Sequence, residues 1–176
     1  MMLTQLITRR TTILSFLALI LCETLYGSEI PQSRSSKSYK SKEKVDKKYY
    51  VSPDKGNQFR AYIYCISAGL ELATVESEEE TDMLNEVLEK DDLKEGWNEG
   101  YWLSGSSLAD PEKLEYYWVS TGQKVIYTNW AKNQPDNAGK KEFCIGVGLV
   151  DKKIAWNDYD PETELRYICQ TRRPCC

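Results

Sequence analysis

The stretch YWLSG (residues 101–105) marks the point where the sequence changes from helical to strand-like patterns. Before it, apolar and aromatic residues recur at helical spacing between residues 58 and 68, and Ser77 with Glu80 forms the capping signature of a second helix. After it, short runs rich in aromatic and β-branched residues are separated by Gly, Asn, Asp and Pro. Helices first and strands later predict an α+β domain.

The expected elements follow from this patterning. The first helix carries Phe59, Tyr62, Ile63 and Ile66 at helical spacing, and the second, after Ser77, carries Met83, Leu84, Val87 and Leu88. The expected strands cover residues 49–51, 101–103, 116–119, 143–150, 154–156 and 167–169. Trp102, Trp118 and Trp130 are expected to be core and loop-anchoring residues rather than ligand platforms.

The first 27 residues have the features of a secretory signal. Arg9 and Arg10 precede an apolar run over residues 13–22, and small residues follow near Gly27. A membrane anchor is the rival interpretation, but the run has only about half of the ~20 residues needed to cross a bilayer. We therefore expect a signal peptide at residues 1–27, a secreted, extracellular protein and no transmembrane span.

Residues 28–48 form a basic Ser/Lys-rich stretch with almost no apolar side chains. This composition predicts a flexible linker, with a heparin- or membrane-binding arm as the alternative. The whole chain has a formal net charge of −4, and nucleic-acid binding needs a concentrated basic surface. Nucleic acid is therefore not expected as a partner, and the 176 residues predict one folded domain.

Histidine is absent from the chain. Its absence excludes Ser-His-Asp and Cys-His nucleophile systems, histidine-based zinc sites and any imidazole base. An enzyme would have to depend on carboxylates alone, for instance with Glu142 and Asp158 as acid and base. We expect that this protein is not an enzyme, because both residues have a better interpretation as metal ligands.

Oxygen donors gather in two segments, NQPDNAGKKEF (residues 133–143) and Trp-Asn-Asp (residues 156–158). The first ends a stretch of some twenty residues with little regular pattern, and a loop that long is usually functional or disordered. The donors are Gln134, Asp136, Glu142, Asn157 and Asp158. Amide and carboxylate oxygens together are the ligands that Ca²⁺ prefers, and Pro135 permits a cis peptide between two of them. Gln-Pro-Asp alone also fits a plain turn, and the combination makes the calcium prediction specific.

With these motifs the chain resembles the C-type lectin-like domains over residues 49–170. The matching features are Cys65 and Cys169 as first and last framework cysteines, the tryptophan motif at residues 101–105, Trp118, the Gln-Pro-Asp loop, Glu-Phe-Cys at residues 142–144 and Trp-Asn-Asp at residues 156–158. The run from Ser120 to Trp130 is similar to the secreted lectins of insects. The resemblance implies a C-type lectin-like fold, with two helices, small antiparallel sheets and a long calcium-binding loop.

The resemblance also implies a function for the five oxygen donors. In such lectins the same residues bind Ca²⁺ and form hydrogen bonds with two neighbouring sugar hydroxyls. The order of Gln134 before Asp136 goes with galactose-type glycans in this family. No aromatic residue follows in Asn137 to Lys140, so we expect weak or relaxed galactose selectivity. Innate recognition of microbial glycans is one setting that suits a lectin of this kind, and a module that binds a protein surface, with calcium only ordering the loop, is the alternative.

The resemblance implies a disulfide between Cys65 and Cys169, whereas the usual partner position of Cys144 is occupied by Pro161. Removal of residues 1–27 leaves an odd number of cysteines. In the tail, residues 171–176, adjacent Cys175 and Cys176 are poorly placed to bridge each other. A disulfide-linked homodimer is therefore expected, with small-thiol capping or a return of the tail to Cys144 as alternatives.

Overall fold

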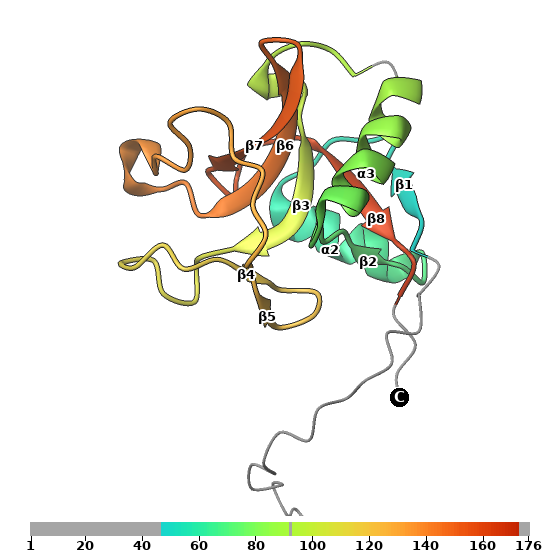
Figure 1. Ribbon diagram of the computed structural model, residues 1–176. Helices are drawn as coiled ribbons and strands as arrows, with labels where there is room; N and C mark the ends of the chain where they lie inside the picture. Colours follow the sequence, from blue (N-terminus) through green and yellow to red (C-terminus); the bar gives the residue numbers. More distant parts are fainter. Residues whose placement is uncertain (1–46, 92, 173–176) are drawn as a thin grey trace, which may run out of the picture. The chain divides into compact units, whose positions relative to one another are not determined.

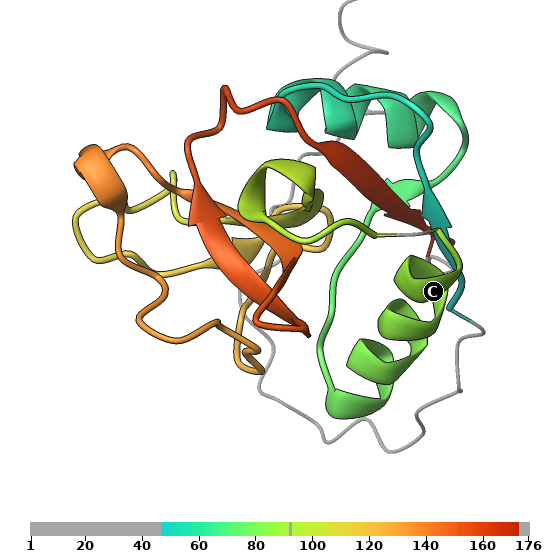
Figure 2. The ribbon, with the colours of Figure 1, turned by 90° about the horizontal axis from the view of Figure 1, so that it is seen from above.

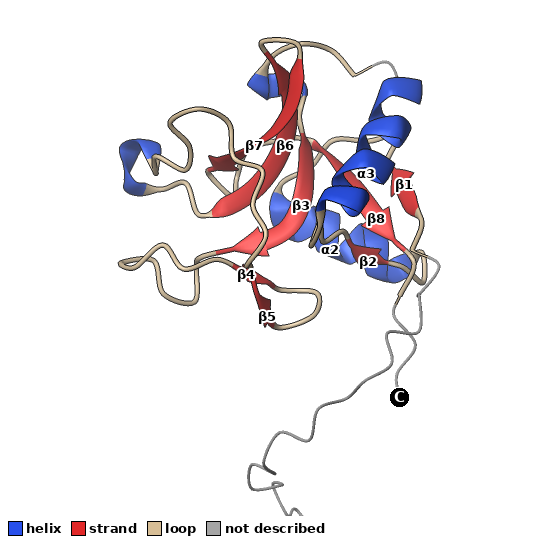
Figure 3. Cartoon of the chain, in the orientation of Figure 1, coloured by secondary structure: helices blue, strands red, loops and turns tan. Residues whose placement is uncertain are grey.

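The computed structural model describes residues 47–172 except residue 92. The expected signal peptide, most of the basic linker and the tail cysteines lie outside the described residues. In chain order the elements are β1 (Tyr49–Val51), α2 (Gln58–Ser67), β2 (Glu71–Leu72), α3 (Glu78–Lys90), η1 (Trp97–Glu99), β3 (Tyr101–Ser106), β4 (Tyr117–Trp118), β5 (Gln123–Lys124), η2 (Ala138–Lys140), β6 (Cys144–Val150), β7 (Lys153–Tyr159) and β8 (Arg166–Gln170) (Figures 1 and 3). Across this part of the chain, no helix is long and apolar enough to cross a membrane.

Both α-helices begin at side-chain caps. The Asn57 side chain accepts a hydrogen bond from the Arg60 amide at 2.9 Å, and Ser77 Oγ accepts from the Glu80 amide at 3.2 Å. The Glu80 carboxylate accepts from the Glu76 amide at 2.7 Å, one residue before the position expected for a capping box. The predicted helix starts are therefore confirmed, with the return hydrogen bond shifted by one residue.

The strands form a mixed sheet in which β8 and β3 are central. β1, β2 and β3 pair with β8, and β3 also pairs with β4 and β6. Among the described strands, β3 with β8 is the one parallel pair, and the others are antiparallel. Gly105 ends the YWLSG stretch where β6 passes close, because a Cβ there would lie 2.4 Å from Ile145 Cδ1. The predicted α+β class is confirmed.

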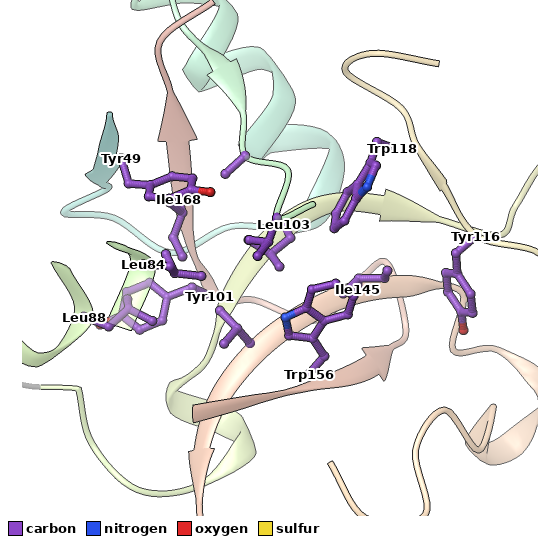
Figure 4. Close-up of a cluster of buried hydrophobic side chains, with 13 residues drawn as sticks. Tyr49, Leu84, Leu88, Tyr101, Leu103, Tyr116, Trp118, Ile145, Trp156 and Ile168 are labelled. Atoms are coloured by element: carbon purple, nitrogen blue, oxygen red, sulfur yellow. The ribbon is translucent and has the colours of Figure 1, made fainter. Parts of the chain in front are cut away.

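Buried aromatic side chains join the sheet to its loops. Trp102, Trp118 and Trp156 are almost completely buried. Trp118 meets Trp156 edge to face with ring centroids 5.6 Å apart, and Figure 4 shows both beside Ile145. Trp130, partly buried, packs on Trp156 at 5.6 Å and anchors the long loop to β7. The expected core and anchoring roles of the tryptophans are confirmed.

The α2 helix has the predicted position but presents an unexpected face. Its apolar residues Phe59, Ile63 and Ile66 are 72%, 56% and 56% exposed, whereas Ala61 and Cys65 are fully buried. The small Ala and Cys side chains allow α2 to pack closely on the rest of the domain, and the disulfide fixes which face turns inward. Phe59, Ile63 and Ile66, whose spacing predicts the helix, therefore form an exposed apolar stripe on α2.

One disulfide and one buried thiol are present in the described chain. Cys65 and Cys169 are bonded with their Cα atoms 5.5 Å apart and 104 residues apart in sequence, which confirms the expected pairing. Cys144 is a free, fully buried cysteine, and burial raises the pKa of its thiol to about 12. Within residues 47–172, no other cysteine is placed to pair with Cys144, and its usual partner position is Pro161.

The folded domain begins earlier than the composition predicts. Lys47, which the sequence places in the basic linker, is buried. Its Nζ donates to the Thr74 carbonyl at 2.8 Å and lies 2.7 Å from a Glu80 carboxylate oxygen. A lysine with a partner carboxylate is stable in a buried position, so composition alone misplaces this boundary.

Candidate metal centre

Three carboxylates of the predicted site lie together. Asp136, Glu142 and Asp158 each offer an oxygen, and these oxygens lie within 4.8 Å of one another. The first two belong to the long loop between β5 and β6, and Asp158 projects from β7. Figures 1 and 2 place this loop at one side of the domain, away from α3. Asp158 is fully buried and Asp136 is exposed, so the cluster opens from the core toward solvent.

Backbone amides of one turn hold the carboxylates in place. Asp158 accepts hydrogen bonds from the amides of Asp136 at 3.1 Å and Asn137 at 2.7 Å. Asp136 and Glu142 both accept from the Ala138 amide, each at 3.1 Å. Because charged acceptors form strong hydrogen bonds, these contacts fix the turn around the carboxylates.

The loop backbone is specified by a few residues. The Gln134–Pro135 peptide is cis, as the sequence allows. Asn133 and Asn137 have positive φ angles of 67° and 46°, a conformation that asparagine adopts more readily than most residues. Asn137 Oδ1 also accepts from the Glu142 amide at 3.0 Å, which ties the two arms of the turn together.

The two predicted amide ligands have buried oxygens without a partner. Gln134 Oε1 and Asn157 Oδ1 are inaccessible to solvent and accept no hydrogen bond. The Asn157 amide nitrogen donates to the Asp158 carbonyl at 2.6 Å, which leaves its oxygen as the unused group. A buried polar atom without a partner is costly and calls for an explanation. Gln134 lies two residues before Asp136, and Asn157 adjoins Asp158, so both oxygens belong to the segments that carry the carboxylates.

The electrostatics of the cluster also favour a cation. Burial raises the pKa of Glu142, and the negative charges of Asp158 and Asp136 raise it further, although the Ala138 amide acts in the opposite direction. Carboxylates that repel one another are stabilised by a divalent ion, and Ca²⁺ takes six to eight hard oxygen ligands. The donor set therefore fits calcium in charge and chemistry.

Two residues beside the centre are absent from the sequence-based set. Asn137 supplies both an amide to Asp158 and an acceptor to Glu142. Tyr116 packs on Trp130 and directs its hydroxyl toward Asp158 Oδ2 at 3.5 Å, and burial followed by the Asp158 charge raises its pKa. A local signal exists for Asn137, which directly follows an acidic ligand in a turn, but none exists for Tyr116, which is distant in sequence.

This geometry accompanies a clear match to known proteins. The sequence matches the family model of the lectin C-type domain over residues 54–171. The chain belongs to the C-type lectin family. The C-type lectin mosGCTL-7 of Aedes aegypti is 33% identical over 131 residues, which are 72% of this chain and 85% of that protein. Perlucin of Haliotis laevigata is 32% identical over 126 residues, which are 71% and 76% of the two chains.

Solved structures have the same fold as this C-type lectin. The carbohydrate-recognition domain of the mouse scavenger receptor C-type lectin superposes with a TM-score of 0.60 at 26% identity, over 75% of this chain and 93% of that one. The corresponding domain of cow CD23, solved in the presence of a GlcNAc2Man3 oligosaccharide, gives a TM-score of 0.58 at 27% identity, over 73% and 90%. The expected C-type lectin-like fold is confirmed.

Proposed function

We propose that this C-type lectin binds carbohydrate through a calcium ion held by Gln134, Asp136, Glu142, Asn157 and Asp158. The observation that carries the proposal is the pair of buried amide oxygens without partners, in the same two segments as three carboxylates that lie within 4.8 Å of one another. A cation at this position would offset the charge of the carboxylates and give the two amide oxygens a partner. A plain turn requires neither clustered carboxylates nor buried amide oxygens without partners.

The side chains of the site match what a sugar requires. Each sugar hydroxyl is both a donor and an acceptor, so it needs a carboxylate on one side and an amide N–H on the other. Gln134 and Asn157 supply the N–H groups, and the carboxylates supply the acceptors. When bound, calcium supplies a hard Lewis-acidic centre to which two neighbouring hydroxyls add as ligands.

Galactose-type glycans are the proposed ligands. The order of Gln134 before Asp136 supports this preference through the family resemblance. The turn after Asp136 consists of Asn137, Ala138, Gly139 and Lys140, without an aromatic ring for the apolar face of the sugar. Selectivity for galactose over mannose is therefore expected to be weak.

Secretion and a binding role complete the proposal. The signal features at residues 1–27 support export, and the Cys65–Cys169 disulfide suits an oxidising compartment. Glu142 and Asp158 act as metal ligands in this account, so these two carboxylates are not free to serve as the acid and base of a hydrolase. Recognition of microbial glycans outside the cell is a setting consistent with these properties.

A second candidate is a module that binds a protein surface. The observation that favours it is the lack of an aromatic residue after Asp136. In that case calcium orders the loop over residues 129–142 and does not contact the ligand. Free sugar would then leave partner binding intact.

A glycan array probed with and without calcium tests the proposal. We expect binding to terminal galactose that requires calcium, disappears with chelator and competes with free galactose. Binding that persists in chelator would contradict the calcium site. An array without calcium-dependent signal, together with partner binding that galactose and mannose leave unchanged, would favour the protein-binding candidate.

A further inference from the structure

The exposed stripe on α2 is part of a larger apolar surface. Phe59, Ile63 and Ile66 are more than half exposed, and so are Leu108 and Val119, which follow β3 and β4. Single exposed apolar residues are common on proteins, but a contiguous group indicates an interaction site. The metal centre does not account for this surface, because the two share no residue.

A groove of about 800 Å³ runs between α2 and the segments after β3 and β4. Phe59, Ile66, Leu108 and Val119 line it. Tyr62 also lines the groove, and its hydroxyl donates to the Ser104 carbonyl at 2.6 Å, so the ring is fixed in place. The groove is thus a formed hollow with an apolar lining, of the kind that receives another apolar surface.

The C-terminal end of the described chain lies at this groove. Arg172 lines it and donates from Nε to the Leu70 carbonyl at 3.1 Å. In the sequence Cys175 follows Arg172 by three residues, and three residues of extended chain span at most roughly 11 Å. Glu71 and Glu162 also line the groove, which gives it charges of both signs.

We propose that the groove receives the α2 face of a second copy of this chain, and that Cys175 or Cys176 of each copy joins the two. A symmetric dimer uses the same surface on both partners. The stripe of one copy provides the apolar residues that the groove of the other needs, and Arg172 can meet Glu71 or Glu162 across the interface. The basic stretch before residue 47 is a poorer occupant, because it has few apolar side chains.

The covalent step needs an external oxidant of a common kind. One tail thiol from each copy reacts with a low-molecular-weight disulfide, which is reduced to two small thiols while the intersubunit disulfide forms. The protons of the two cysteines pass to the small thiols. Cys144 does not compete, because it is fully buried in the core.

The reach of the tails limits where the second copy can sit. Three or four extended residues on each side span roughly 10–14 Å, and a disulfide adds about 5.5 Å between Cα atoms. The two Arg172 residues must then lie within about 25–34 Å. A dimer formed through the groove meets this limit, because Arg172 is part of its lining.

Dimerisation would benefit weak sugar binding without changing the sugar site itself. Two linked sites gain avidity through effective concentration. The affinity of one site for free sugar is unaffected, so the dimer and the lectin function are tested by separate measurements.

The test compares Phe59→Glu/Ile66→Glu with a matched control, Ile126→Glu, by sedimentation equilibrium, with Cys175→Ser/Cys176→Ser in every chain so that no reductant is needed and the Cys65–Cys169 disulfide stays intact. Phe59 and Ile66 are exposed, so both substitutions leave the fold intact, which circular dichroism checks. Ile126 is 82% exposed and lies outside the groove. We expect the chain with the tail substitutions alone and Ile126→Glu to dimerise, and Phe59→Glu/Ile66→Glu to have a dimer dissociation constant about a hundredfold higher or more.

A second variant, Cys175→Ser/Cys176→Ser, separates the covalent link from the groove. On non-reducing gels wild type should migrate as a dimer and this variant as a monomer, while the variant still dimerises through the groove in sedimentation equilibrium without reductant. A Cys175→Ser/Cys176→Ser chain that is monomeric at every concentration would overturn the proposal. So would equal dimerisation of Phe59→Glu/Ile66→Glu, or a groove that binds a small apolar probe while the chain stays monomeric.

Discussion

The two sides of the domain are held by different interactions. On one side, the Cys65–Cys169 disulfide and the buried face of α2 tie the helix to β8. On the other, Trp130 packs on Trp156, and the backbone amides of residues 136–138 donate to three carboxylates. On the second side, the buried amide oxygens of Gln134 and Asn157 lack partners in the same two segments that carry the three carboxylates. The comparison teaches that the scaffold is stabilised covalently and by packing, whereas the loop gathers oxygen donors that the proposed cation would satisfy.

Breaking the disulfide should have the largest effect. Cys65→Ser opens a loop of 104 residues, and chain entropy assigns about 4.7 kcal/mol to a bridge of this length. Because total stability is usually about 5–15 kcal/mol, we expect a large fall in the melting temperature. Cys144→Ala is the control, since it removes a buried thiol without a bridge and should cost far less. Equal melting of Cys65→Ser and wild type under oxidising conditions would contradict the role of the bridge.

Calcium should stabilise the loop side and leave the disulfide side unchanged. Extracellular calcium modules have dissociation constants near 10⁻⁴–10⁻³ M, so ~10 mM calcium should add about 1.4–2.7 kcal/mol of stability. Urea unfolding measures this increment. Hydrogen exchange should slow in residues 129–142 and remain unchanged in β1 and β8. Equal slowing in all strands would show that the two sides are not independent.

Asn137→Gly should weaken the calcium site without changing the scaffold. Glycine keeps the positive φ at this position but removes the Asn137 Oδ1 acceptor of the Glu142 amide. The lost hydrogen bond corresponds to about 1 kcal/mol, or a roughly fivefold weaker calcium affinity. Calorimetric titration of calcium measures it. An affinity equal to that of wild type would mean that Asn137 does not organise the site.

A polar contact on the disulfide side should have the smallest effect. Burial alone would raise the pKa of Asp91, but hydrogen bonds from Arg166 and Tyr101 hold this pKa below its usual range. Stability from this contact is present at neutral pH and is lost as pH falls through the lowered pKa. Asp91 and Arg166 are each about a quarter exposed, so the contribution should stay under about 1 kcal/mol. Asp91→Asn should remove this acid dependence from the free energy of unfolding. A pH profile equal to that of wild type would show that the contact does not contribute to stability.

The sequence predicts where helices and strands lie in this chain better than it predicts which side of a helix is buried. The helix from Gln58, the cap at Ser77 and the strands around Trp102 and Trp156 depend on local patterns, and the structure contains them. The exposed stripe on α2 was not predictable in this way, because the disulfide and the small residues of α2 decide which face is buried. The two-residue strands β2 and β5 are too short to show a period.

The sequence names the five oxygen donors of the candidate site, of which the structure brings three carboxylates together, but it does not show the contacts that support them. The five oxygen donors come from two short motifs that sequence displays directly. Tyr116 approaches Asp158 across 42 residues of sequence, and the amides that hold the carboxylates carry no side-chain signal. Long-range packing and backbone hydrogen bonds therefore remain outside what the motifs can show.

Retention on immobilised galactose tests the central claim most directly, with Asp158→Asn compared with Asp151→Asn. Both variants remove one carboxylate, but Asp158 is buried in the metal centre, whereas Asp151 is exposed in the turn after β6. We predict that wild type and Asp151→Asn are retained in calcium and released by chelator, while Asp158→Asn passes through although it melts as a folded protein. Retention of Asp158→Asn equal to wild type, or retention of wild type in chelator, would contradict the account.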